Sequence, residues 1–147
     1  MIHERIDLAA EGRVNLQTYI HESIDSSMYG PQMDPRPAVI VITGGGYALL
    51  SKTEAEPVAL TFLKEGFHTF VLNYTIGEGC VYPIPLEEIS RAVWEVRKRA
   101  EEWHVDPNAI ALMGFSAGAA IAGMSATQWN TPGLYERVGA PNAESIR

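Results

Sequence analysis

Three short, mainly apolar runs constrain the fold of this chain more than any other feature. They span 38–42, 69–74 and 110–113, and the first shows no polar alternation at all. Such runs are typical of strands that are buried on both faces. Helical patterns lie between them, so the sequence predicts an α/β fold, with a mostly parallel sheet and helices on both of its faces. Ligands of such sheets bind beyond the carboxyl ends of the strands.

Apolar positions three and four residues apart predict helices over 55–63, 86–100 and 117–127. Ser51 is followed three residues later by Glu54, which predicts a capping box before the first helix. Residues 15–20 alternate between polar and apolar and predict an edge strand. Residues 25–37 predict a turn-rich linker, and residues 131–141 predict a loop.

The composition fits a single domain over residues 1–147, with 46% hydrophobic and 20% charged residues. A net charge of −7 argues against nucleic acid or an anionic membrane as partner. Cys80 is the only cysteine, so an internal disulfide is excluded. The charged start does not suit a signal peptide, and no stretch approaches the roughly 20 apolar residues of a membrane span. We therefore expect a cytoplasmic protein.

The sequence Gly-Phe-Ser-Ala-Gly at 114–118 directly follows the third apolar run and precedes a helix rich in small residues. This is the strand–turn–helix setting of a nucleophile elbow, in which glycines allow a sharp turn that exposes the serine hydroxyl. Gly-x-Ser-x-Gly also arises by chance, but its position here favours function. We predict Ser116 as a catalytic nucleophile, with the N–H of Ala117 at the helix start directed at a developing anion.

A run of three glycines at 44–46 follows the first apolar strand. Without side chains, the backbone N–H groups of Gly45 and Gly46 can approach a substrate carbonyl, as an oxyanion hole requires. A flexible turn is the plain alternative. A phosphate loop is disfavoured, because neither the dinucleotide nor the Walker pattern is present. Tyr47 is predicted either to line a substrate pocket or to pack.

None of the four histidines has the context of a general base for Ser116. His68 and His104 are predicted to lie away from the turn, and His3 and His21 belong to the N-terminal segments. Among the carboxylates, Glu88 is expected on a solvated helix face. No spacing of histidine and cysteine suits a metal, and we expect no cofactor.

These motifs together resemble the α/β-hydrolase superfamily, and most of all its small bacterial esterases and lipases of the acetyl-xylan-esterase type, related to the hormone-sensitive-lipase group. The matching stretches are 39–47, 54–63, 70–74, 85–97 and 105–118. The resemblance implies hydrolysis of a carboxylic ester through an acyl-serine intermediate, on small acyl or acetylated carbohydrate esters. Ser116 would be the nucleophile, and Gly45, Gly46 and Ala117 would supply the oxyanion hole.

Members of this superfamily carry the acid and the histidine of the triad after the serine, on loops that follow later strands. The resemblance therefore predicts the N-terminal part of an esterase, with the C-terminal strands missing and weak activity alone. A non-catalytic binding module is the second hypothesis, with a homo-oligomer or a complementing C-terminal fragment as partner. A histidine supplied across a subunit interface is the third.

Overall fold

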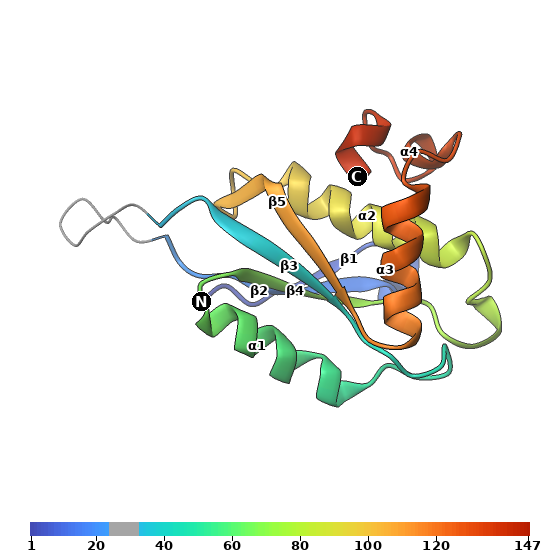
Figure 1. Cartoon of the computed structure of the whole chain (residues 1–147), viewed down its shortest axis with the longest axis horizontal. Coiled ribbons are helices and arrows are strands. Elements are labelled where there is room, and N and C mark those ends of the chain that lie inside the picture. The colour runs from blue at the N-terminus through green and yellow to red at the C-terminus, as the bar shows by residue number, and fades with distance from the viewer. Residues whose placement is uncertain (24–32) are drawn as a thin grey trace.

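The computed structural model describes residues 1–23 and 33–147, which form a mixed sheet with helices on both faces (Figure 1). The strands are β1 (Arg5–Asp7), β2 (Asn15–Tyr19), β3 (Arg36–Ile42), β4 (His68–Asn73) and β5 (Val105–Gly114). The helices are α1 (Glu56–Lys64), α2 (Ile84–Lys98), α3 (Ala117–Gln128) and α4 (Leu134–Arg137). Short 3₁₀ helices span Ala10–Gly12, Lys52–Glu54, Gly77–Gly79 and Ala143–Ile146. Most of the predicted linker, 25–32, lies outside the described residues.

The strands lie in the order β1-β2-β4-β3-β5. β4, β3 and β5 are parallel, with Ile42 in register with both Leu72 and Gly114. β1 and β2 run antiparallel on the side of β4. The three apolar runs therefore end together, and the loops that follow them lie at the same end of the parallel strands. This confirms the predicted α/β architecture and sets the glycine run beside the Ser116 turn.

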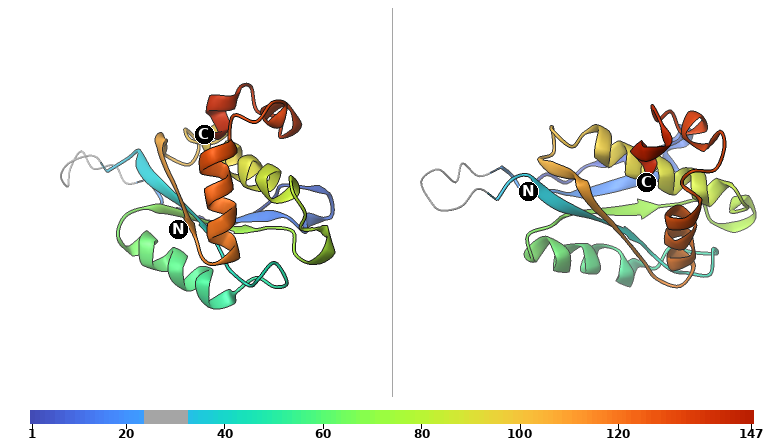
Figure 2. Two further views of the ribbon diagram at one scale, coloured as in Figure 1. Left: turned by 45° about the vertical axis from the view of Figure 1, so that its right-hand side comes forward. Right: turned by 45° about the horizontal axis from the view of Figure 1, so that its top comes forward.

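The alternation of side chains along β3 divides the core into two layers. Its even-numbered residues, such as Ile40, pack with α2 and α3, whereas Val39 and Val41 pack on the side of α1. Figure 2 shows α1 alone on one face of the sheet and α2 and α3 on the other. The C-terminal residues pack over α2, where Leu134 and Ile146 are fully buried. The predicted loop at 131–141 thus contains the short helix α4.

Two strands differ from the prediction in their place in the sheet. β2 was expected at an edge but lies between β1 and β4. β5 was expected to be buried on both faces, yet within the described residues it pairs only with β3 and forms an edge. Its Ala111 is exposed, and Leu112 is only half-buried. Apolar patterning indicates that a strand is suited to burial, but it does not identify the neighbour that buries it.

Glu88 on α2 is also placed differently from the prediction. It was expected in solvent but is 3% exposed. Its carboxylate accepts hydrogen bonds from the backbone N–H of Thr75, at 2.8 Å, and from the hydroxyl of the same residue. A buried carboxylate needs such partners. Glu88 thus fixes the loop that follows β4 onto the first turns of α2.

Candidate active site

Ser116 lies in the turn between β5 and α3, beyond the carboxyl end of β5. Its φ of 48° and ψ of −114° fall in a region that residues with a Cβ rarely adopt. The turn is anchored on both sides: Phe115 N–H donates to Ile42 O, and Ala119 N–H donates to Ser116 O, each at 3.0 Å. The surrounding backbone therefore holds Ser116 in a strained conformation, with the residue exposed at the sheet edge.

The two glycines that flank Ser116 have no room for a side chain. A Cβ on Gly114 would lie 2.3 Å from the carbonyl oxygen of Gly118, and one on Gly118 would lie 2.1 Å from that of Ile42. Both obstructions are backbone atoms, which cannot rotate away. The glycines thus let α3 pack directly against the end of β3, and this close packing gives the turn its shape.

The glycine run at 44–46 lies next to Ser116. A Cβ on Gly44 would be 3.2 Å from the Cβ of Ser116. The carbonyl groups of the run point toward the following turn: Gly44 O accepts from Ser51 N–H at 3.0 Å, and Gly45 O accepts from Ala48 N–H at 3.0 Å. Because C=O and N–H point in opposite directions across a trans peptide, the N–H groups of Gly45 and Gly46 point away from that turn.

In the part of the chain that the structure describes, the N–H groups of Gly45, Gly46 and Ala117 donate no hydrogen bond. The Ala117 N–H belongs to the first turn of α3, where backbone donors have no partner inside the helix. A Cβ on Gly46 would meet nothing within 4 Å. Two loops thus bring three free donors to the carboxyl ends of the strands, where Ser116 also lies.

Tyr47 directly follows the glycine run and has a φ of 63°. Its ring packs against the core on the side of α2, and its carbonyl accepts from Gly77 N–H at 2.6 Å. The packing role that the sequence left open is therefore present. Contact of Tyr47 with a substrate stays a prediction.

Sequence reasoning missed the part of Glu54 in this site. Ser51 makes no capping hydrogen bond, and α1 begins only at Glu56. The expected capping box is therefore absent from the described structure. Instead, the Glu54 carboxylate accepts from Gly44 N–H at 2.7 Å. The spacing of Ser51 and Glu54 is typical of a cap, and no local signal pointed to Gly44 instead.

The four histidines lie at the other end of the parallel strands, near their amino ends. His68 opens β4 in register with Ala38, whereas Ser116 follows the carboxyl end of β5. His21 N–H donates to Nδ1 of His68, His3 stacks near Tyr19, and the carbonyl of His104 accepts from the start of β3. The prediction that none of them serves Ser116 agrees with this placement.

His68 is fully buried, and its Nε2 has no hydrogen-bond partner among the described residues. Burial, and then the nearby charge of His21, lowers the pKa of His68 to about 4. That value includes a smaller lowering by Arg36 and the opposing effects of the His104 backbone and the charge of Asp34. The folded chain therefore holds His68 neutral at ordinary pH.

We expect this histidine to weaken the fold in acid. The unfolded chain takes up the His68 proton near pH 6.5, whereas the folded chain does so only near pH 4. The contribution is therefore complete above pH 6.5 and is lost as the pH falls toward 4, by about 3 kcal/mol. Urea unfolding of the wild type and of His68→Gln at pH 7 and pH 4.5 measures it. An equal loss in both proteins would show that other groups cause it.

Within residues 1–23 and 33–147, no group of three or more His, Cys, Asp and Glu side chains is placed to hold a metal ion. No helix in this same part of the chain has the length and apolar character needed to cross a membrane.

The family model BD-FAE matches residues 27–146. An endo-1,4-beta-xylanase B from Butyrivibrio fibrisolvens is 36% identical over 115 residues, which cover 73% of this chain and 18% of that protein. An acetylxylan esterase from Xylanibacter ruminicola is 35% identical over 91 residues, 61% of this chain and 19% of the esterase.

The crystal structure of MGS-M1, an alpha/beta hydrolase enzyme from a Medee basin deep-sea metagenome library, superposes with a TM-score of 0.79 at 34% identity. The match covers 85% of this chain and 51% of MGS-M1. The chain thus spans less than a fifth of the two curated relatives and about half of this enzyme. Since the family model covers most of the chain and the fold agrees with it, the protein belongs to the BD-FAE family of α/β hydrolases.

Proposed function

We propose that this chain is the nucleophile-bearing part of a carboxylic-ester hydrolase. One observation carries the proposal: Ser116 is held in a strained turn at the same end of the parallel strands as three backbone N–H groups that have no acceptor among the described residues. Donors of this kind stabilise the negative charge that forms on a carbonyl oxygen during acyl transfer. Because one of the similar proteins is an acetylxylan esterase, we extend the proposal to small acyl esters and acetylated carbohydrates.

In the proposed reaction, the Ser116 hydroxyl loses its proton to a base as its oxygen bonds to the ester carbonyl carbon. The carbonyl oxygen becomes an oxyanion that Gly45, Gly46 and Ala117 N–H stabilise. Collapse breaks the bond to the alcohol, which takes up a proton and leaves an acyl-serine. Water then attacks the acyl-serine in the same way, releasing the acid and restoring the hydroxyl.

The base is the missing component, because all four histidines lie away from Ser116. We therefore expect the purified chain to hydrolyse p-nitrophenyl acetate slowly and imidazole in solution to restore part of the rate. A base in the right place contributes about 10²–10⁴-fold, so rescue of at least about tenfold is expected. Ser116→Ala measures the reaction of imidazole itself with the ester, and Ser125→Ala is the matched control.

Two results would contradict this proposal. Equal imidazole-dependent rates in the wild type and in Ser116→Ala would remove Ser116 from the reaction. Hydrolysis by the chain alone at ordinary esterase rates would contradict an external base, because loss of the histidine costs about 10⁶-fold in a well-studied serine hydrolase.

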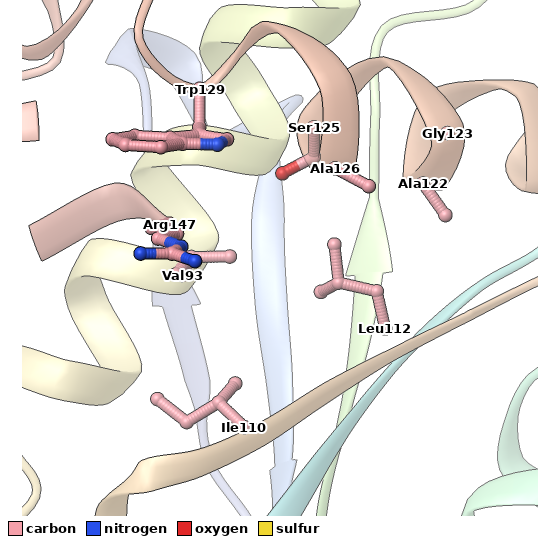
Figure 3. A pocket seen from close by; sticks show the side chains of 9 residues that line it. All are labelled: Val93, Ile110, Leu112, Ala122, Gly123, Ser125, Ala126, Trp129 and Arg147. Carbon is pink, nitrogen blue, oxygen red and sulfur yellow. The ribbon is translucent and has the colours of Figure 1, made fainter. Parts of the chain in front are cut away.

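A complementing segment is the second candidate, and the edge of β5 favours it. Beside this edge lies a groove of about 540 Å³. Figure 3 shows its apolar walls, with Ile110 and Leu112 on one side and Trp129 near the C-terminal Arg147. An unprotected apolar edge normally pairs with another strand. Size-exclusion chromatography of the purified chain should show either that it associates with itself or that it binds a complementing segment. A monomer that unfolds cooperatively and binds neither would favour a self-sufficient binding module.

A further inference from the structure

The peptide group between Thr43 and Gly44 is held at both of its ends by side chains from other segments. Tyr74 Oη donates to the Thr43 carbonyl oxygen at 2.8 Å, and Gly44 N–H donates to Glu54 Oε2 at 2.7 Å. We propose that Glu54 and Tyr74 are positioning residues that together orient the 44–46 loop for oxyanion binding. This inference rests on the proposed function of that loop.

Tyr74 directly follows β4 and is 1% exposed, so its hydroxyl reaches the end of the neighbouring strand β3 from inside the core. Burial, and then the nearby Cys80, Tyr47 and Glu54, raise the pKa of Tyr74 to about 12. The hydroxyl thus keeps its proton at neutral pH and remains a donor to Thr43 O. One end of the peptide group is therefore fixed by a side chain that the core itself immobilises.

Glu54 comes from the 3₁₀ helix that precedes α1, and it makes no ion pair within the described residues. Ser51 in the same segment donates its N–H to Gly44 O at 3.0 Å. The 51–54 segment thus binds both the N–H and the C=O of Gly44. A bond from N–H to a carboxylate is stronger than one between neutral groups, so Glu54 is the firmer of these two contacts.

The hydrogen bonds that Tyr74 and Glu54 make with this peptide group, here called the clamp, act on a part of the loop that lies next to Ser116. A Cβ placed on Gly44 would lie 3.1 Å from Glu54 Oε2 and 3.2 Å from the Cβ of Ser116. The next two peptide groups carry the free N–H groups of Gly45 and Gly46. The held group fixes where the loop leaves β3. Because each peptide is planar, the hydrogen bonds to Gly44 O and Gly45 O then set the directions of the Gly45 and Gly46 N–H groups. An oxyanion hole depends on donors that are oriented before the reaction begins.

The negative charge of Glu54 strengthens its hydrogen bond, but it is the position of the oxygen that orients the loop. A carboxylate close to a developing oxyanion is electrostatically unfavourable, so its value here lies in the geometry of its oxygen. A glutamine at the same position offers a neutral oxygen to the same N–H. Glu54→Gln should therefore keep the clamp, whereas Glu54→Ala should release it.

The test combines two readouts on Glu54→Gln, Glu54→Ala and Tyr74→Phe. The first is the hydrogen-exchange rate of the Gly44 amide by NMR, which needs no activity, with a core amide of β3 as reference for overall stability. We expect exchange to accelerate at least about 100-fold in Glu54→Ala and to change little in Glu54→Gln. Glu56→Ala, an exposed carboxylate at the start of α1, is the control.

The second readout is imidazole-rescued ester hydrolysis. Glu54→Ala and Tyr74→Phe should each lower kcat by about 10- to 100-fold, less than the loss of a whole oxyanion donor, and leave KM unchanged. The double variant should lose less than the product of the single effects, because both residues act on one peptide group. Glu54→Gln should retain most of the rate.

Two results would overturn the inference: unchanged Gly44 exchange in Glu54→Ala, or an equal loss of kcat in Glu54→Gln and Glu54→Ala. A clamp seen by exchange in a chain that shows no ester hydrolysis at all would leave the positioning of the loop intact and count against the proposed function instead. The two failures are therefore distinguishable.

Discussion

Gly118→Ala is expected to destabilise the chain by about 3 kcal/mol or more, enough to leave much of it unfolded. The added Cβ would lie 2.1 Å from the carbonyl oxygen of Ile42 and 2.6 Å from its carbonyl carbon. No side-chain rotation relieves a contact with backbone, so α3 would have to move away from β3. The same movement would let the backbone at Ser116 relax from its strained conformation.

Gly123→Ala is the matched control, because it makes the same change in the same helix. A Cβ at Gly123 would meet nothing within 4 Å. Alanine is the better helix former by about 0.5–1 kcal/mol, so this variant should be slightly more stable than the wild type. Guanidinium unfolding followed by circular dichroism compares the three proteins. If Gly118→Ala matched Gly123→Ala in stability, the close packing of α3 on β3 would be wrong.

Replacing Ser116 is expected to abolish ester chemistry, and the variants Ser116→Ala and Ser116→Gly should differ in stability. The φ of 48° and ψ of −114° strain any residue with a Cβ by about 1–3 kcal/mol. Ser116→Ala keeps this strain, whereas Ser116→Gly relieves it and should be more stable than Ser116→Ala by about 1 kcal/mol. Both should lose the imidazole-rescued rate completely.

The same unfolding experiment measures the difference between the two Ser116 variants. Equal stability would show that the backbone at Ser116 is relaxed and that the turn stores no strain. A higher stability of Ser116→Gly would measure what the strained turn costs the fold.

Local patterns predicted the elements that bring the site together. The apolar runs at 38–42 and 110–113 indicated β3 and β5, and the helical period indicated α2 and α3. Since parallel strands end at a common edge, the sequence alone predicted that the 44–46 run and Ser116 would lie at the same edge of the sheet. Periodicity indicates which side of a segment packs against a core. It was therefore enough to predict these strands and helices.

Contacts between distant segments were beyond these patterns. The partner of Glu54 is the N–H of Gly44, ten residues earlier in another loop, and a local capping pattern was the more evident use for the same carboxylate. Glu88 lies on a helix turn whose period allows exposure, but the loop after β4 covers it. The order of strands likewise depends on pairing, so the interior place of β2 could not be predicted.

Mapping a fluorophosphonate adduct by mass spectrometry tests the nucleophile assignment most directly. The reagent phosphonylates serine through the same oxyanion-stabilised attack, and the other serines of the chain provide an internal comparison. One oxyanion donor alone contributes about 10²–10³-fold, so Ser116 should react at least about 100-fold faster than any other serine even without a base. Ser125→Ala should label as the wild type does. Label spread evenly over other serines, or a label that persists in Ser116→Ala, would contradict the assignment of Ser116 as the nucleophile.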